Sequence, residues 1–260
     1  VALYYRQIRE QWNAMQRSFH IIIFLALFGQ VLFPLTLYIG LQYTSSLNAA
    51  IYLSTTPALV LLINKTIFKE KITIQNIAGV IISSFGVAYL VMQGDLWHLE
   101  TLKHLNRGDL WTMGSAASWA VYCAFLRIKP REVGGNAFVA VSATIGAIVL
   151  FPILIFSMAK NGIPPLAELG HSGLVIGLLY LIIFPSWLSY LMWNKGIQAI
   201  GATRGEVFSH FIPLSGGLFS VMFLSELLHI YHLVSALLII CGIALCSGKS
   251  VKRAFKASVS

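Results

Sequence analysis

Charged residues are scarce in this chain of 260 residues. Asp, Glu, Lys and Arg together make up 10% of it, whereas soluble domains contain about 25%. Apolar residues make up 57%, and the mean hydropathy is +0.79. A soluble fold of this composition would leave much apolar surface in water. The scarcity of charge therefore argues against a soluble protein and favours a lipid environment, where a spanning helix needs roughly 20 apolar residues.

Cysteine is also scarce, and its pattern excludes two kinds of site. Cys123, Cys241 and Cys246 all lie in apolar stretches, and their spacing fits neither a disulfide framework nor a metal site. The segment ELLHIYH contains the Glu-x-x-His pair Glu226 and His229. Metal sites in helical bundles use two such pairs, and the sequence has no second one. We therefore expect neither a metal nor a cofactor.

Long stretches without Asp, Glu, Lys or Arg predict membrane-spanning helices. The stretch 18–64 is long enough for two helices, and the polar segment Gln42–Asn48 is its natural break. The stretches are continuously apolar rather than alternating, which disfavours a β-barrel. We therefore predict an all-α polytopic membrane protein. Its eight predicted spans are 20–40, 47–66, 73–92, 109–127, 136–158, 173–194, 205–225 and 230–247.

The distribution of the basic residues along the chain explains the net charge of +9 by membrane orientation. With the N-terminus inside and the spans alternating, 15 of the 18 basic residues face the cytoplasm, and Lys103, Arg107 and Lys160 remain outside. The positive-inside rule thus explains the charge without a nucleic-acid partner. We expect a multi-pass protein of the plasma membrane, or of the inner membrane in a bacterium, with both termini cytoplasmic. The basic tail 248–260 is expected to touch anionic lipid.

The chain also resembles itself at a fixed offset. Shifted by 156 residues, the part from about 21 to 90 aligns with a later part without a gap. The coincidences include Gly40 with Gly196, Gln42 with Gln198, Pro57 with Pro213, Glu70 with Glu226, and Gly86 with Gly242. Glycine, glutamine, proline and glutamate are uncommon enough here for such matches to indicate a duplicated unit.

The two copies differ in their number of predicted spans. The first repeat, 1–92, holds three, the second, 108–247, holds five, and 248–260 is a tail. We therefore expect two further helices before Val1 and a complete bundle of ten helices arranged as 5+5. Because five is odd, the two copies have opposite orientations in the membrane. Inverted repeats of this kind are typical of secondary transporters.

Two segments show a family resemblance. LYIGLQYTSSLNAAIYLSTTPALVLLINKTIFKEKITIQNIAGVIISSFGVAYL spans 37–90, and WNKGIQAIGATRGEVFSHFIPLSGGLFSVMFLSELLHIYHLVSALLIICGIAL spans 193–245. Both resemble the drug/metabolite transporter superfamily, EamA type, and GDLWTMGSAASWAVYCAFLR (108–127) resembles the opening helix of its second repeat. The resemblance implies export of small metabolites, amino acids or drugs by alternating access rather than enzymatic catalysis.

Matched prolines predict helix breaks in both copies. Pro57 and Pro213 each lack an amide proton, which leaves the carbonyls of Leu53 and Ser209 without their helical donors. Matched breaks in two repeats are the best sequence indication of a central binding site. The alternative is a pair of helices that bend to fit their neighbours.

Glu206 and His210 are the ionisable residues of interest, and each has two interpretations. Glu206 either stabilises a helix start and pairs with Lys195 or Arg204, or it couples transport to an ion. His210 follows four residues later on the same helical face. It either forms a hydrogen bond to a neighbouring helix or belongs to a proton site.

Other polar and aromatic residues within spans complete the candidates for a substrate path. Their side chains suit neutral, zwitterionic or amphipathic small molecules, because few fixed charges lie deep in the spans. A non-transporting scaffold, a passive facilitator and, less favoured, an intramembrane lipid enzyme are the alternatives; the oligomeric state stays open. The further candidates are Gln30, Tyr38, Asn48, Tyr52, Thr55, Thr56, Ser118, Trp119, Tyr122, Trp187, Tyr190, Asn194 and Ser209.

Overall fold

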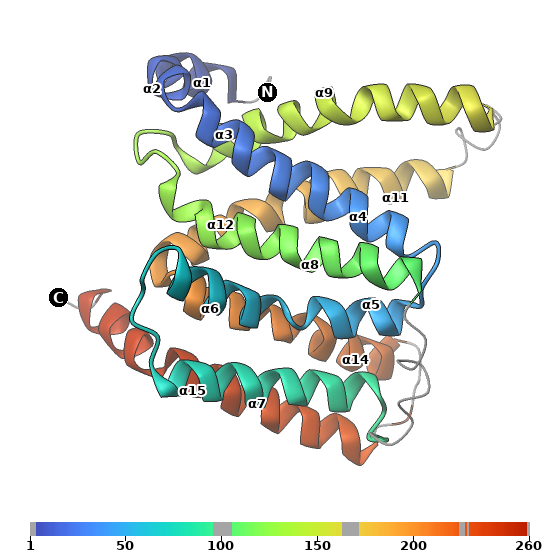
Figure 1. Cartoon of the computed structure of the whole chain (residues 1–260), viewed down its shortest axis with the longest axis vertical. Helices are drawn as coiled ribbons and strands as arrows, with labels where there is room; N and C mark the ends of the chain where they lie inside the picture. The colour runs from blue at the N-terminus through green and yellow to red at the C-terminus, as the bar shows by residue number, and fades with distance from the viewer. Residues whose placement is uncertain (1–3, 96–105, 163–171, 224–226, 228, 259–260) are drawn as a thin grey trace. The chain divides into compact units, whose positions relative to one another are not determined.

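The computed structural model of the chain describes residues 4–95, 106–162, 172–223, 227 and 229–258. Every regular element within these ranges is a helix (Figure 1). The all-α polytopic class predicted from the sequence is thus confirmed, and the count of eight spans stays a prediction. Among the described residues, five helices are long and apolar enough to cross a membrane: Phe19–Gly40, Ile74–Val91, Gly135–Lys160, Gly173–Ile200 and Ile230–Ser247.

The other three predicted spans take a different form. Two are interrupted: α5 (Ser46–Leu53) and α6 (Thr56–Thr66) share one, and the short 3-10 helix η6 (Glu206–His210) precedes α14 (Phe211–Phe223) in the other. The third is α8 (Arg107–Phe125), which is continuous but contains many Gly, Ser and Thr residues. The interrupted spans are the ones that carry Pro57 and Pro213.

Two helices begin with reciprocal side-chain caps. At the start of α7 (Ile74–Val91), the Thr73 hydroxyl accepts from the Asn76 amide at 3.2 Å, and Asn76 Oδ1 accepts from the Thr73 amide at 3.1 Å. Asn106 and Asp109 form the same pair at the start of α8, at 3.0 and 2.9 Å. Each cap satisfies amides that have no acceptor within the helix. Such caps account for the places where these helices begin.

The chain divides into two compact units, which we describe separately. Unit 1 comprises Val1–Val31 and Ile128–Ala199, and unit 2 comprises Leu32–Arg127 and Ile200–Ser260. Each unit contains segments from both halves of the chain. This division reflects packing, whereas the predicted repeats reflect duplication of the sequence. The boundaries of the repeats therefore stay a prediction.

In unit 1 the helix α3 packs along α9, and side chains hold the segment that leads into α9. Gln11 Oε1 accepts from the Gly134 amide at 2.7 Å. Lys129 is buried and donates to the carbonyls of Pro130, at 3.0 Å, and Val133. Burial lowers the pKa of the Lys129 amino group. The elements of unit 1 are α1 (Tyr5–Glu10), α2 (Trp12–Arg17), α3 (Phe19–Ala26), α9 (Gly135–Asn161), α11 (Ser172–Ile183), the π-helix η5 (Phe184–Leu188) and α12 (Ser189–Ile200).

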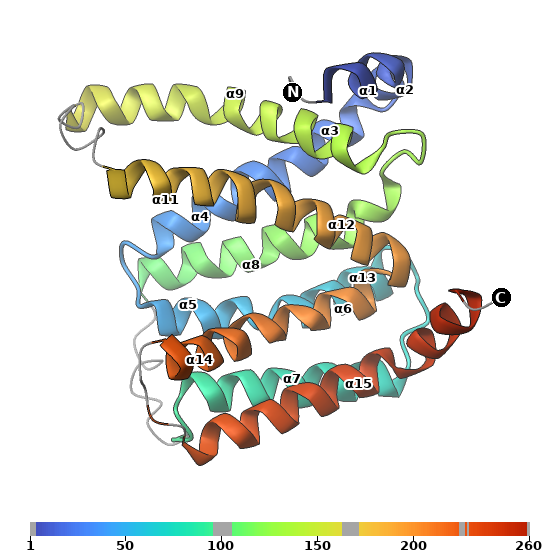
Figure 2. The ribbon, with the colours of Figure 1, turned by 180° about the vertical axis from the view of Figure 1, so that it is seen from behind.

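In unit 2 the helices α7 and α15 (Ile230–Ser258) lie side by side and cross closely (Figure 2). A Cβ atom on Gly79 would lie 2.6 Å from the carbonyl oxygen of Gly242, and a Cβ on Gly242 would lie 2.6 Å from that of Gly79. Only glycine permits this approach. The buried cluster beside the crossing consists of Leu61, Val80, Val87, Val207, Ile239, Ile243 and Cys246.

A second close crossing in unit 2 joins α4 (Phe33–Gly40) to α8. A Cβ atom on Gly108 would lie 2.6 Å from the Gly40 carbonyl oxygen. The Ser115 hydroxyl donates to the Phe33 carbonyl at 2.8 Å, nearer the other end of α4. These contacts fix α8 against α4 and so position the aromatic residues of α8 that are candidates for the substrate path.

Candidate functional site

The first interrupted span lies in unit 2, between α5 and α6. Pro57 is the second residue of α6 and has no amide proton, so the Leu53 carbonyl lacks its helical donor. The Thr56 hydroxyl donates to that carbonyl at 2.6 Å instead. The Ser54 carbonyl accepts from Nε2 of His210 at 3.0 Å. Side chains thus satisfy two carbonyls at this break, and one of those side chains comes from the second interrupted span.

The contact between Ser54 and His210 has a special place in the predicted repeat. The two residues are 156 apart, which is the offset of the repeat. The contact therefore joins the same position of the two predicted copies. Copies related by a two-fold axis bring equivalent positions together only at that axis, which lies in the membrane plane in inverted repeats. Under the predicted duplication, the Ser54–His210 contact marks this axis.

The second interruption is the 3-10 helix η6, which follows the short helix α13 (Ala202–Gly205). The chain then continues as α14, with Pro213 as its third residue. A 3-10 turn within a longer helical path often marks a hinge or a functional segment. Both Glu206 and His210 are buried on η6.

Glu206 is fully buried, with 0% of its surface exposed. Neither carboxylate oxygen has a well-formed hydrogen bond within the described part of the chain, although the side chains of Trp119, Cys123 and Ser209 lie close enough to interact. Among the described residues, the ion pairs do not include Glu206. The expected pairing with Lys195 or Arg204 is therefore not seen. We call Glu206, Ser209, His210, Trp119 and Cys123 the Glu206 cluster.

Aromatic rings extend the cluster along α8. The ring centroids of Trp119 and Tyr122 are 5.2 Å apart, and those of Trp119 and Phe33 are 4.6 Å apart. Tyr122 is almost fully buried, with 1% of its surface exposed. Trp119 and Tyr122, both predicted from the sequence as path candidates, lie in the same unit as Glu206. Trp119 also belongs to the Glu206 cluster.

Three further candidates of the first copy, Asn48, Tyr52 and Tyr38, have other positions in unit 2. The Asn48 amide donates to the Ser45 hydroxyl at 3.1 Å, and Asn48 Nδ2 donates to the Thr44 hydroxyl at 3.2 Å, so Asn48 shapes the start of α5. Tyr52 is half-buried on α5. Tyr38 is 61% exposed on α4, which places its ring on the surface of unit 2.

Tyr190 and Asn194 belong to unit 1, where both are buried on α12. The Tyr190 hydroxyl donates to the Gly29 carbonyl, and Asn194 lies one helical turn later with 1% of its surface exposed. They therefore form a polar region separate from the unit that contains the Glu206 cluster. Which of these residues line a transport path stays a prediction.

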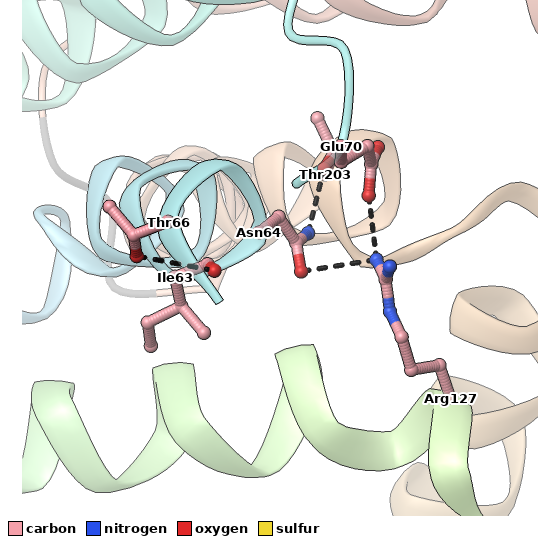
Figure 3. A network of polar contacts seen from close by, with 6 residues as sticks. All are labelled: Ile63, Asn64, Thr66, Glu70, Arg127 and Thr203. Atoms are coloured by element: carbon pink, nitrogen blue, oxygen red, sulfur yellow. Dashed lines mark hydrogen bonds and ion pairs between the residues drawn. The ribbon is translucent and has the colours of Figure 1, made fainter. Parts of the chain in front are cut away.

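A polar network that the sequence did not predict joins several helix ends of unit 2 (Figure 3). Arg127 donates to Glu70 at 2.6 Å and to Oδ1 of Asn64 at 3.1 Å, and its guanidinium lies 4.4 Å from the ring centroid of Phe68. Asn64 Nδ2 donates to the Thr203 hydroxyl at 2.7 Å. The sequence could have drawn attention to Asn64, because it is an amide within an otherwise apolar predicted span. Its partner Thr203 could not be identified in this way, because it is 139 residues away.

The segment ELLHIYH is described in part, at Leu227 and from His229 onward. No group of three or more His, Cys, Asp or Glu side chains in the described part of the chain is placed to hold an ion. His229 and His232 stack with ring centroids 6.0 Å apart, and the His229 amide donates to Nδ1 of His232 at 3.1 Å. Glu226, which forms the Glu-x-x-His pair with His229 in the sequence, lies outside the described residues.

Comparison with known families and structures agrees with the fold. The EamA-like transporter family matches residues 1–92 and 106–248. A chain of known crystal structure has a TM-score of 0.69 and 17% identity, covering 89% of this chain and 76% of its own length. At that identity, the likeness shows the fold alone.

Relatives from bacteria and archaea are named as transporters. The uncharacterized transporter YyaM of Bacillus subtilis strain 168 is 26% identical over 234 residues, which cover 89% of this chain and 73% of YyaM. An uncharacterized transporter of Archaeoglobus fulgidus is 26% identical over 225 residues, which cover 86% of this chain and 75% of the relative. Neither name states a substrate.

Proposed function

The chain belongs to the EamA-like transporter family and is a multi-pass membrane transporter, and from this premise we propose that it is a secondary transporter that exports small metabolites, amino acids or drug-like compounds by alternating access. The observation that carries the proposal is the Ser54–His210 hydrogen bond of 3.0 Å, which joins the two interrupted spans beside the buried Glu206. Interrupted helices of matched repeats typically surround the substrate site of such transporters.

The orientation follows from the distribution of basic residues. We propose that both termini are cytoplasmic, in the plasma membrane or, in a bacterium, the inner membrane. The network of Arg127, Glu70, Asn64 and Thr203 then lies at the cytoplasmic ends of its helices. These contacts hold the ends of α6, α13 and α8 together, so an inward-open state requires the network to separate.

The Glu206 cluster supports coupling to protons. A buried carboxylate without a basic partner is unfavourable unless it takes up a proton or another cation. His210 Nε2 donates its proton to the Ser54 carbonyl, because a carbonyl can only accept, and Nδ1 has no partner among the described residues. Nδ1 is therefore able to receive a proton one helical turn from Glu206. In this proposal, protonation of the pair changes the contact between the two interrupted spans.

Transport by the purified full chain in liposomes tests the proposal. With a pH gradient imposed, we expect a mixture of labelled amino acids and small metabolites to yield at least one compound that accumulates against its own gradient. Glu206→Gln and His210→Ala are expected to abolish accumulation driven by the proton gradient. If both variants accumulate that compound like the wild type, proton coupling through this pair is wrong.

The same assay separates the alternative functions. A scaffold moves no compound, and a passive facilitator brings compounds only to equal concentrations on both sides. An intramembrane lipid enzyme would change the lipids of the vesicles, which mass spectrometry of those lipids detects. Glu10→Gln is the matched control variant, because Glu10 lies in an exposed pair with Arg6 at 3.2 Å.

A further inference from the structure

Two π-helical turns lie at equivalent positions of the predicted repeat. The first is η2 (Leu27–Leu32), within the span Phe19–Gly40, and the second is η5 (Phe184–Leu188). Shifted by the offset of 156, the second turn coincides with 28–32. Such turns are rare in proteins and occur frequently at functional sites. Two of them at the same place in both copies therefore indicate a purpose other than local packing.

Pro34 in the first copy and Tyr190 in the second occupy the same position of the predicted repeat, and both bear on the Gly29 carbonyl of the first turn. Pro34 lacks the amide proton that a π-helical turn would donate to the carbonyl of Gly29, five residues earlier. The Tyr190 hydroxyl donates to that carbonyl. Tyr190 is the residue that corresponds to Pro34 in the second copy, because the two are separated by the offset. The second copy thus supplies the hydrogen bond that the first copy lacks.

Two buried N–H donors lie close in sequence to the partners of this hydrogen bond. Gln30 follows Gly29 in the chain, and Trp187 lies one turn before Tyr190 on the same helical path. Neither Nε2 of Gln30 nor Nε1 of Trp187 finds an acceptor among the described residues, and both atoms are buried. A buried donor without an acceptor is unfavourable for folding. Their retention on two matched π-helical turns points to an acceptor that arrives from outside the protein.

Packing holds Gln30 in place. A Cβ atom on Gly146 of α9 would lie 3.0 Å from the Cβ of Gln30, so α9 passes directly beside that side chain. The Trp187 ring lies 6.2 Å from the ring of Tyr4, measured between centroids. Both donors are therefore held by neighbouring elements of unit 1. Fixed neutral donors suit an oxygen acceptor and leave a cationic group without a partner.

We infer that Gln30 and Trp187 form a subsite that binds an oxygen acceptor of the transported molecule, a carboxylate or a carbonyl. The inference rests on the proposed transport function and adds the chemical class of the group that unit 1 recognises. Gln30 Nε2 and Trp187 Nε1 donate to that oxygen, and Tyr190 keeps the two turns together through Gly29. A compound without such an oxygen leaves both donors unpaired and binds less well.

The test uses the purified full chain in liposomes and three matched sets of probes. These are the proteinogenic L-amino acids, their C-terminal amides, and the amines that remain when the carboxyl group is removed. We expect the amines to move at least about tenfold more slowly than their parent acids or amides, as the loss of a hydrogen bond to a charged or polar partner implies. Comparison of acids with amides separates carboxylate from carbonyl recognition.

Variants test whether Gln30 and Trp187 cause the difference in flux between acids or amides and amines. Gln30→Leu and Trp187→Phe are expected to reduce the ratio of acid or amide to amine flux about tenfold, and Gln30→Glu to reject acids more than amides. The matched controls Gln42→Leu and Trp12→Phe change residues at exposed positions and should keep the wild-type ratio. Trp187→Phe retains a ring and so serves where a change at Gln30 impairs folding.

The outcomes distinguish this inference from the proposed function. If the wild type moves amines as fast as their parent acids and amides, transport stands and the subsite is overturned. If the variants keep the wild-type ratio, the oxygen acceptor is recognised elsewhere, and the assignment to Gln30 and Trp187 is likewise overturned. If the wild type moves none of the probes in a system where other compounds accumulate, the inference fails while transport stands. If no compound moves at all, both fail.

Discussion

Two buried polar regions in the described part of this transporter have opposite hydrogen-bonding needs. In unit 2, Glu206 offers two carboxylate oxygens that have no well-formed hydrogen bond within the described part of the chain. In unit 1, Gln30 and Trp187 offer two N–H donors without an acceptor there. A carboxylate favours a proton or a cation, and neutral donors favour an oxygen. In both regions the groups without a partner lie where regular α-helix gives way to another helix type. These places are the 3-10 helix η6 in unit 2 and the π-helical turns η2 and η5, which carry Gln30 and Trp187. A bound ligand can supply the missing hydrogen bonds there.

Conventional helices carry both satisfied and unsatisfied buried polar groups within the described residues. Asn48 Oδ1 on α5 and the hydroxyls of Ser235 and Ser247 on α15 have no hydrogen-bond partner there. The capping pairs Thr73–Asn76 and Asn106–Asp109 satisfy each other, and the carbonyls at the break between α5 and α6 have side-chain donors. The unpaired groups of Glu206, Gln30 and Trp187 differ from these because they lie on η6 and on the two matched π-helical turns. If they serve function, their removal should improve stability while impairing transport, as is common at functional sites.

The largest expected effect concerns Glu206. Glu206→Met replaces a buried carboxylate that has no basic partner among the described residues by an apolar side chain, and we expect the free energy of unfolding to rise by about 3 kcal/mol. Gln30→Leu should raise it by only about 1 kcal/mol, because an amide is neutral. Chemical unfolding in detergent measures both. A loss of stability in Glu206→Met would show that the carboxylate has a structural partner and would break the comparison.

A second effect contrasts tight and open helix surfaces in the two units. Gly79→Ala in α7 would place its Cβ 2.6 Å from the Gly242 carbonyl oxygen, so we expect the free energy of unfolding to fall by about 2 kcal/mol. Gly177→Ala in α11 of unit 1 meets nothing within 4 Å and should be neutral or stabilise by up to about 1 kcal/mol. Thermal unfolding of the two variants side by side checks this. Equal losses would contradict the close crossing.

The smallest expected effects concern two variants of the Arg127 network, one at a buried residue and one at a partly exposed ion pair. Asn64 is fully buried, so Asn64→Leu removes one hydrogen bond of Arg127 and the Asn64 donor to the Thr203 hydroxyl. It should lower the free energy of unfolding by about 1.5 kcal/mol. The Arg127–Glu70 pair is about one third exposed on each side, so Glu70→Gln should lower it by less than about 1 kcal/mol. Unfolding at low and high salt separates the two, since only the ion pair is screened. The reverse order of effects would contradict this account.

Much of the architecture was accessible from the sequence. Continuous apolar runs predicted helices because lipid requires every backbone group to be satisfied within the segment. The matched prolines Pro57 and Pro213 marked the spans that the structure shows in pieces. The π-helical turns were missed, although Pro34 and Pro185 lie within predicted spans and were available as signals. Proline alone does not say whether a helix breaks, bends or widens into a π-turn.

The site was accessible only in part. Trp119 was among the predicted path residues, and the structure places it close to Glu206. Tyr38 was predicted on the same grounds and is exposed on α4. Both are aromatic residues in apolar spans, and hydropathy does not tell which face of a helix packs inward when nearly every face is apolar. Asn64 and Thr203 show the same limit, because partners far apart in the sequence have no common local pattern.

The sequence by itself determined the helical class, the membrane environment and the offset of 156 residues, since these depend on composition, run length and self-similarity. Only the tertiary structure decided which polar groups find partners. It gave His210 the Ser54 carbonyl and Gly29 the Tyr190 hydroxyl, and it left Glu206, Gln30 and Trp187 with unmet hydrogen-bonding capacity. The physical reason is that a hydrogen bond depends on the position of both partners, and in a helical bundle those partners come from helices distant in sequence.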